Sequence, residues 1–229
     1  MKNLIITISL GNRPWFNKIK KYYENYALKT NSHFIVINDN YQGDINSRIR
    51  KFEIVKYLDS YDRILFLDDT CIISPLCPNI FEIVPKSLLG VVCEKPPYYD
   101  KINLLKESLN YYNIENNIQN NDYIWFNSGL ILFSKCHKDL FNKPNKQIKK
   151  VGNYLDQALF NANRYKYNFP IFDLGLRYNY MGTRIEKQDP YKINDLDNIY
   201  IYHVTRAWKP SKREKKFDEI LNIISNMDV

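Results

Sequence analysis

The stretch RILFLDDTCIIS, residues 63–74, decides the fold. Its unbroken apolar run, Ile64 to Leu67, is followed at once by two adjacent carboxylates, Asp68 and Asp69. A short run of this composition is typical of a strand buried on both faces, as in the parallel sheets of α/β proteins. Ligands of such sheets bind outside the carboxyl ends of the strands. The two carboxylates therefore stand where a ligand site is expected.

Segments typical of strands and helices alternate along the rest of the chain. Apolar runs bounded by turn residues predict strands at residues 3–9, 33–39, 63–69, 88–94, 125–134, 169–174 and 198–204. Helical spacing of apolar residues predicts helices at residues 15–28, 49–58, 154–162 and 215–227, and a helix with an irregular insertion within residues 100–121. We therefore expect one α/β domain over residues 1–229, with a mainly parallel central sheet flanked by helices.

The charge of the chain points to an anionic partner. Its 229 residues carry a formal net charge of +8, with a sequence pI near 9.1. Nucleic acid, an anionic membrane surface and a nucleotide diphosphate all fit such a charge. The sequence contains no basic helix interleaved with aromatic side chains, so we expect no nucleic-acid partner.

The sequence also bears on location. No apolar run is long enough for a membrane span or organised as a secretory signal, so we expect no membrane insertion and a cytoplasmic protein. The four cysteines, Cys71, Cys77, Cys93 and Cys136, lack zinc-site and C-x-x-C spacing and are predicted to be reduced and mostly buried. Heavy use of Asn, Ile, Lys and Tyr favours a viral or microbial origin.

The adjacent carboxylates Asp68 and Asp69 need a physical reason. They repel each other, and an unpaired carboxylate at a strand end is costly to bury. A divalent cation removes this cost, and Mg²⁺ or Mn²⁺ commonly binds one or two carboxylates together with substrate phosphates. The alternative is that Asp69 and Thr70 begin a turn or cap a neighbouring element.

Five segments, taken in order, resemble one protein family. They are ITISLGN (residues 6–12), RKFEIVKYLDSYDRILFLDD (50–69), FNSGLILFS (126–134), DQALFN (156–161) and HVTRAWKP (203–210). Each is weak alone, but the ordered set resembles the retaining, nucleotide-sugar-dependent glycosyltransferases of family 8, the glycogenin and bacterial galactosyltransferase group. The segments extend over almost the whole chain. The resemblance implies a Rossmann-like GT-A fold.

The resemblance also implies an activity and its residues. It implies transfer of a sugar from a UDP-sugar to a hydroxyl of a glycan or protein acceptor, with retention of configuration and with Mn²⁺ or Mg²⁺ as cofactor. The implied metal ligands are Asp68, Asp69 and His203. The implied nucleotide-sugar-binding residues are Thr7, Ser9, Asn12, Lys51, Asp68 and Lys209, and Arg206 is added to them because its charge suits a diphosphate. The implied catalytic residues are Asn127, Asp156 and Gln157, and Gln157 is expected to approach the reacting carbon.

Two positions depart from the family pattern. Thr70 stands where the family has the second aspartate of its metal motif, and Arg206 stands where it has glycine. Either Asp68 and Asp69 share the metal, or one ligand is a neutral hydroxyl. Arg206 either helps to bind the diphosphate or blocks the loop. A non-catalytic relative that binds nucleotide sugars therefore stays open as an alternative, and a basic nucleic-acid-binding protein is a weaker one.

The site residues also have purely structural interpretations. His203 is then a strand-end histidine with satisfied hydrogen bonds, Lys51 and Lys209 are exposed lysines, and Asp156 complements the amino end of a helix. Residues 127–129, Asn-Ser-Gly, interrupt an apolar strand. They form either a β-bulge or a point where another backbone or a sugar comes close.

Overall fold

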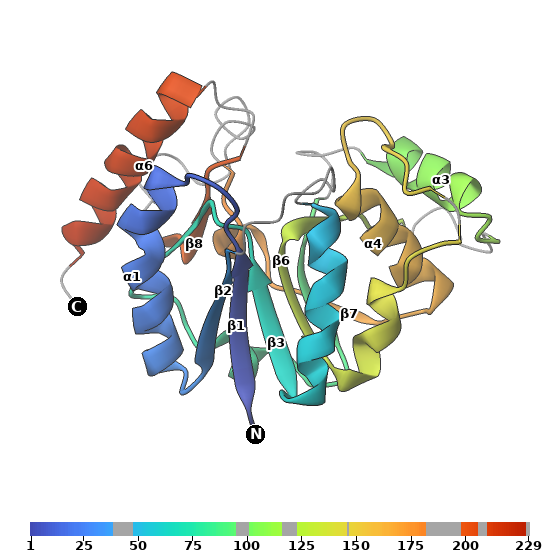
Figure 1. Ribbon diagram of the computed structural model, residues 1–229, viewed down its shortest axis with the longest axis horizontal. Helices are drawn as coiled ribbons and strands as arrows, with labels where there is room; N and C mark the ends of the chain where they lie inside the picture. Colours follow the sequence, from blue (N-terminus) through green and yellow to red (C-terminus); the bar gives the residue numbers. More distant parts are fainter. Residues whose placement is uncertain are drawn as a thin grey trace.

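A computed structural model describes the chain over residues 1–38, 48–94, 101–115, 123–145, 147–181, 198–205 and 210–227 (Figure 1). Its centre is a six-stranded sheet with the order β2-β1-β3-β6-β5-β7. The strands are β1 (Asn3–Ile8), β2 (His33–Ile37), β3 (Arg63–Leu67), β5 (Leu89–Cys93), β6 (Phe126–Ser134) and β7 (Ile171–Asp173). β1 pairs in parallel with β2 and β3, and β5 with β7, while β6 runs antiparallel between β3 and β5. The predicted mainly parallel α/β sheet is confirmed.

Two apolar layers cover the faces of this sheet. Because side chains alternate along a strand, Leu65 and Leu67 of β3 join one cluster while Ile64 and Phe66 join the other. The first cluster contains residues of α1 (Pro14–Lys29) and α6 (Pro210–Ser225), which lie side by side in Figure 1. The second contains residues of the 3₁₀ helices η1 (Ile49–Asp59) and η2 (Lys135–Phe141) and of α4 (Asp156–Lys166). Burial on both faces explains why the strands read as continuous apolar runs.

Smaller elements complete the described chain. β4 (Cys71–Ile73) and β8 (Ile201–His203) form a separate antiparallel pair directly after the end of β3. The remaining helices are α2 (Ile80–Ile83), α3 (Ile102–Tyr111) and η3 (Leu176–Tyr178). The apolar run that resumes after Asp69 thus forms its own strand in a second sheet and does not prolong β3.

The segment predicted as a helix at residues 49–58 is a 3₁₀ helix, and this difference bears on the pocket. Three residues complete one 3₁₀ turn, so side chains three positions apart lie on the same side. Ile54 and Lys51 are related in this way, and both are buried. Ile54 packs in the second apolar cluster, and Lys51 reaches the pocket described below.

Two further expectations concern cysteines and membranes. All four cysteines are free thiols, with Cys71, Cys77 and Cys93 buried and Cys136 exposed. This agrees with the prediction that the cysteines are reduced and mostly buried. Within the ranges that the structure describes, no helix has both the length and the apolar composition that crossing a bilayer requires.

Candidate functional site

A cavity of about 560 Å³ opens at the carboxyl ends of β1 and β3. Asp68, Asp69 and Thr70 form its floor directly after β3, and the backbone N–H of Asp68 donates to the Gly129 carbonyl at 2.9 Å. Because β6 is antiparallel to β3, the first residues of β6 lie at the same end of the sheet as the last residues of β3. The topology therefore brings together the two polar interruptions that the sequence places 58 positions apart, at residues 69 and 127.

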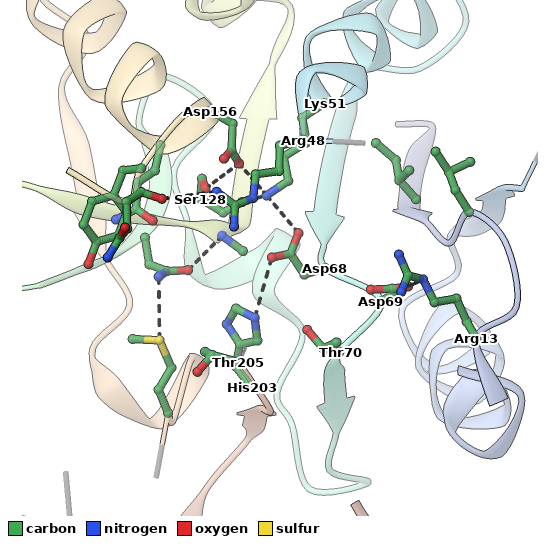
Figure 2. Close-up of a pocket in the computed structure, with 18 of the residues that line it drawn as sticks. Arg13, Arg48, Lys51, Asp68, Asp69, Thr70, Ser128, Asp156, His203 and Thr205 are labelled. Carbon is green, nitrogen blue, oxygen red and sulfur yellow. Dashed lines mark hydrogen bonds and ion pairs between the residues drawn. The ribbon is translucent and has the colours of Figure 1, made fainter. Parts of the chain in front are cut away.

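Lys51 is the central cation of the cavity (Figure 2). Its Nζ lies 2.9 Å from Asp68 Oδ1 and 2.7 Å from Asp156 Oδ2, and it donates to the Ser128 carbonyl at 3.2 Å. Ser128 Oγ donates to the same Asp156 oxygen at 2.9 Å. Lys51 is buried, with 6% of its surface exposed, so the interpretation as an exposed helical lysine is wrong.

The charges of this group hold each other in the ionised state. Burial opposes the ionisation of Asp156, but the nearby Lys51 ammonium and the hydrogen bonds from Lys51 and Ser128 outweigh it, and the pKa of Asp156 is lowered. Burial likewise opposes the charge of Lys51, and the carboxylates of Asp156 and Asp68 outweigh it, so the pKa of Lys51 is raised. Asp156, the first residue of α4, is thus a partner in a buried charge network and more than a complement to the helix dipole.

His203 reaches the opposite side of Asp68. Pairing of Cys71 with His203 between β4 and β8 sets the imidazole beside the end of β3. Its Nε2 lies 3.6 Å from Asp68 Oδ2, and its Nδ1 lies 2.8 Å from Asn179 Oδ1. An amide oxygen can only accept, so Nδ1 donates to Asn179, and Nε2 is the ring nitrogen that faces the carboxylate.

Gly129 makes room for this imidazole. A Cβ atom added at Gly129 would lie 2.4 Å from His203 Cε1 and 2.9 Å from His203 Nδ1. A group does approach this glycine closely, as expected, but it is the His203 side chain and not a backbone or a sugar. The register between β5 and β6 also shifts here, between Val91 and Cys93, which is either a β-bulge or another irregularity of the ladder.

Asp69 points away from Asp68 (Figure 2). Its Oδ2 lies 3.4 Å from Arg13 Nε. Burial and the charge of Asp68 raise the pKa of Asp69 to about 6, although Arg13, a hydrogen bond from Ser9 and Lys51 oppose the shift. Among the described residues, no three His, Cys, Asp or Glu side chains converge as metal ligands would. The structure therefore brings together two of the three predicted ligands, Asp68 and His203, but not Asp69.

Asn127 and Gln157 lie buried at the wall of the cavity. Asn127 Nδ2 donates to Glu94 Oε1 at 3.0 Å, and Asn127 Oδ1 accepts from the Gly129 N–H at 2.8 Å. Gln157 Nε2 is buried and has no hydrogen-bond partner among the described residues. Glu94, 3% exposed, was not anticipated, although a carboxylate that directly follows an apolar strand is the same signal that marks Asp68.

Solved structures resemble this chain, whereas no family profile and no curated protein sequence matches it. A glycosyltransferase involved in glycosylation of the major capsid of PBCV-1 matches with a TM-score of 0.63 and 13% identity, over 95% of this chain and 100% of that one. The bifunctional glycosyltransferase WbbM matches with a TM-score of 0.63 and 14% identity, over 98% of this chain and 50% of that one. The galactosyltransferase LgtC, solved with donor and acceptor sugar analogs, matches with a TM-score of 0.60 and 16% identity, over 99% of this chain and 97% of that one. The chain has the GT-A fold.

The GT-A fold is the fold that the five segments implied. Three further residues that were expected at the nucleotide lie in or near β1. Thr7 and Ser9 are buried in and just after β1, and Asn12 is exposed in the following turn. Among the described residues, these three are not part of the cavity lining, although Ser9 reaches Asp69 through its side chain. Arg206 and Lys209 lie outside the described residues.

Four further cations line the GT-A pocket and were not anticipated. They are Arg13, Arg48, Lys150 and Arg213. Arg13 lies in the turn after β1, and Arg48 precedes Lys51 by one 3₁₀ turn, so their positions relative to the first strand and to Lys51 were signals in the sequence. Lys150 and Arg213 carry no such local signal, because distant segments bring them to the pocket.

Proposed function

We propose that this chain is a metal-dependent glycosyltransferase that moves a sugar from a UDP-sugar to a hydroxyl of a glycan or protein acceptor. The observation that carries the proposal is the facing pair of Asp68 and His203 beside Lys51, in the cavity at the carboxyl ends of the central strands. The GT-A fold and the five resembling segments support the same assignment. Retention of anomeric configuration rests on the resemblance.

The donor atoms present fit a divalent cation. A carboxylate oxygen of Asp68 and Nε2 of His203 face each other at 3.6 Å, and when the imidazole is neutral the two atoms can share a cation. The hydrogen bond of His203 Nδ1 to Asn179 is the outer contact that orients a metal-binding histidine. Asp68 and His203 would hold the ion, with diphosphate oxygens as further ligands. Imidazole suits Mn²⁺ better than Mg²⁺. When bound, the ion supplies positive charge to the diphosphate.

The chain's own residues supply the rest of the site. The side chains of Arg13, Arg48, Lys150 and Arg213 line the cavity, and their positive charge suits a ligand with two phosphates. Such cations also stabilise the negative charge that develops on a departing diphosphate. Lys51 holds Asp68 and Asp156 in fixed positions rather than standing free for a ligand. Among the described residues nothing accepts from the buried Gln157 Nε2, which can donate to a sugar hydroxyl.

Binding is tested by thermal shift with uridine diphosphate and other nucleoside diphosphates, each with and without Mn²⁺. A ligand that binds only the native state raises Tm. We expect uridine diphosphate with Mn²⁺ to give the largest shift, and Asp68→Asn to remove it. Lys56→Gln, at an exposed lysine of η1, is the matched control and keeps the shift. If no nucleotide shifts Tm, the donor assignment fails.

Catalysis is tested by hydrolysis and transfer from UDP-sugars. We expect turnover with Mn²⁺ that stops when a chelator is added and returns when Mn²⁺ is restored. Binding of uridine diphosphate without turnover of any UDP-sugar contradicts the proposed activity and leaves the non-catalytic nucleotide-sugar-binding alternative.

A further inference from the structure

A second cavity lies at the other end of the β3–β6 pair. The ladder runs from the pair Arg63 and Ser134 to the pair Leu67 and Leu130, so the Arg63 end is the one remote from Asp68. The cavity has a volume of about 670 Å³. Its lining consists of Met1, Asp62, Arg63, Lys86, Ser87, Ser134, Lys135 and Cys136.

Arg63 is the unusual member of this lining. Only 1% of its surface is exposed, and it is the first residue of a strand whose other residues are apolar. Its Nη1 donates to the Phe81 carbonyl. Its Nε and Nη2 are buried and have no hydrogen-bond partner among the described residues. These two nitrogens share one edge of the planar guanidinium, the fork that binds two oxygens of a phosphate or carboxylate at once.

No carboxylate of the described chain compensates this guanidinium. Asp62 is the acidic member of the lining, but its Oδ2 accepts from the Lys2 N–H at 2.9 Å and its Oδ1 lies 3.5 Å from Lys135 Nζ. Burial lowers the pKa of Arg63, which is the direction expected for a cation without an anionic partner. The lining as a whole holds three cationic side chains, those of Arg63, Lys86 and Lys135, against the one carboxylate of Asp62.

The neighbouring Cys136 and His137 argue for binding rather than chemistry at this cavity. His137 Nδ1 accepts from the Ser134 N–H at 3.1 Å, so its lone pair is already used, and its Nε2 lies 3.3 Å from the Ser87 carbonyl, to which it donates. Burial lowers the pKa of His137, which keeps the ring neutral. A neutral imidazole with both nitrogens engaged cannot act as a base toward the Cys136 thiol.

We propose that this cavity, centred on Arg63, binds the phosphate group of a free phosphate ion or of a phosphate monoester. The Nε and Nη2 edge is buried behind the lining and has no partner among the described residues, so it offers two donors to phosphate oxygens once the side chain turns toward the cavity. The exposed lysines 86 and 135 at the rim add the charge that favours a dianion over a monoanion. A bound anion also removes the cost of an unpaired buried cation, which a purely structural arginine would leave in place. The site is separate from the cavity at Asp68 and does not depend on the function proposed there.

The test is a thermal-shift titration of the full chain with inorganic phosphate at constant ionic strength, with glycerol phosphate and acetate as parallel arms. At a phosphate concentration about five times the dissociation constant, mass action raises Tm by about 2–4 °C for a chain of this size. We expect Arg63→Met to abolish the shift and Lys56→Gln, at an exposed lysine outside both linings, to retain it. A larger shift with glycerol phosphate than with phosphate would assign the site to a monoester, and the reverse to the free ion.

Three results overturn the proposal. They are no shift with phosphate or glycerol phosphate in the wild-type chain, a shift that survives Arg63→Met, and a shift with acetate larger than that with either phosphate. If Arg63→Met does not fold, the double variant Lys86→Gln and Lys135→Gln decides, because both side chains are exposed. We expect it to bind phosphate at least threefold more weakly by ³¹P NMR titration, and unchanged affinity contradicts the site.

Discussion

The two ends of β3 differ in how a buried cation is compensated. At the carboxyl end, the buried Lys51 ammonium is held between Asp68 and Asp156, at 2.9 and 2.7 Å. At the amino end, the buried Arg63 guanidinium has one backbone acceptor, and its remaining edge has no partner among the described residues. The first charge is compensated within the chain, and the second has no anionic partner among the described residues. Burial alone therefore does not reveal the role of a cation, because the role depends on which groups lie next to the charge.

The largest expected effect is that of Lys51→Met. It leaves Asp156, 5% exposed, without its cation, and breaking a buried pair in this way costs about 3–5 kcal/mol. The free energy of unfolding in urea measures the loss. Lys56→Met, in the same helix but exposed, is the matched control and should change it by less than about 0.5 kcal/mol. A loss below about 1 kcal/mol for Lys51→Met would show that the charge network is not the compensated one described.

Gly129→Ala should act next, by displacing His203. The added Cβ meets the imidazole at 2.4 Å, and overpacking of this kind typically costs about 1–3 kcal/mol. We also expect at least tenfold weaker binding of uridine diphosphate with Mn²⁺, measured by calorimetry. Gly90→Ala is the matched control, because its Cβ meets Val84 at 3.0 Å and Leu132 at 3.1 Å, away from the cavity. It should lose stability without losing binding, and equal losses of binding in both variants would contradict the role of Gly129.

Asp69→Asn tests the charges at the carboxyl end of β3 through the pH dependence of stability. Burial and the charge of Asp68 raise the pKa of Asp69 from 3.8 to about 6, so its ionisation disfavours the folded state. In metal-free buffer, the wild-type chain should lose stability relative to the variant as pH rises from about 4 to 6, by about 1–3 kcal/mol in all. Chemical unfolding at a series of pH values measures this. Asp62→Asn should show the opposite sign, because the Lys2 N–H and Lys135 lower the pKa of Asp62.

Arg63→Met should have the smallest effect on stability. The described residues give Arg63 no anionic partner. Replacing such a buried cation by an apolar side chain of similar length is expected to change the free energy of unfolding by less than about 1 kcal/mol in phosphate-free buffer. The contrast with Lys51→Met is the direct test of the comparison between the two ends of β3. A loss of 3 kcal/mol or more at Arg63 would mean that the chain itself compensates this charge.

Much of this architecture could be predicted from local pattern. Apolar runs of strand length located β1, β2, β3, β5 and β6, and the carboxylates after β3 and the Asn-Ser-Gly interruption of β6 marked the two sides of the pocket. These features are local, because burial on both faces requires an apolar run and a polar residue at its end is visible at once. The strands predicted at residues 169–174 and 198–204 contain β7 and β8. The separate strand β4 and its pairing with β8 were missed, since a three-residue strand is set by its partner rather than by its own pattern. The expectation of a single domain over residues 1–229 stays a prediction.

The site itself was only partly predictable. Asp68, His203, Lys51, Asp156, Asn127 and Gln157 do line one cavity. The orientation of Asp69 toward Arg13 could not be foreseen, because adjacent residues after a strand end point in different directions and their partners come from distant segments. Lys150 and Arg213 were missed for the same reason, whereas Glu94 and Arg48 were missed although each stands at a position that carried a local signal. The metal and the UDP-sugar remain proposals.

By itself, the sequence determined the class of fold, the strands of its core and the end of the sheet where polar side chains gather, because these follow from the two-residue period and the apolar content of each segment. Only the tertiary structure decided which charges meet. It paired Lys51 with Asp68 and Asp156, turned Asp69 to Arg13 and fitted the imidazole of His203 against Gly129. Within the described part of the chain, it left one edge of Arg63 without a partner. The physical reason is that electrostatic and steric contacts depend on distances of a few ångströms between residues far apart in the chain, which no local pattern encodes.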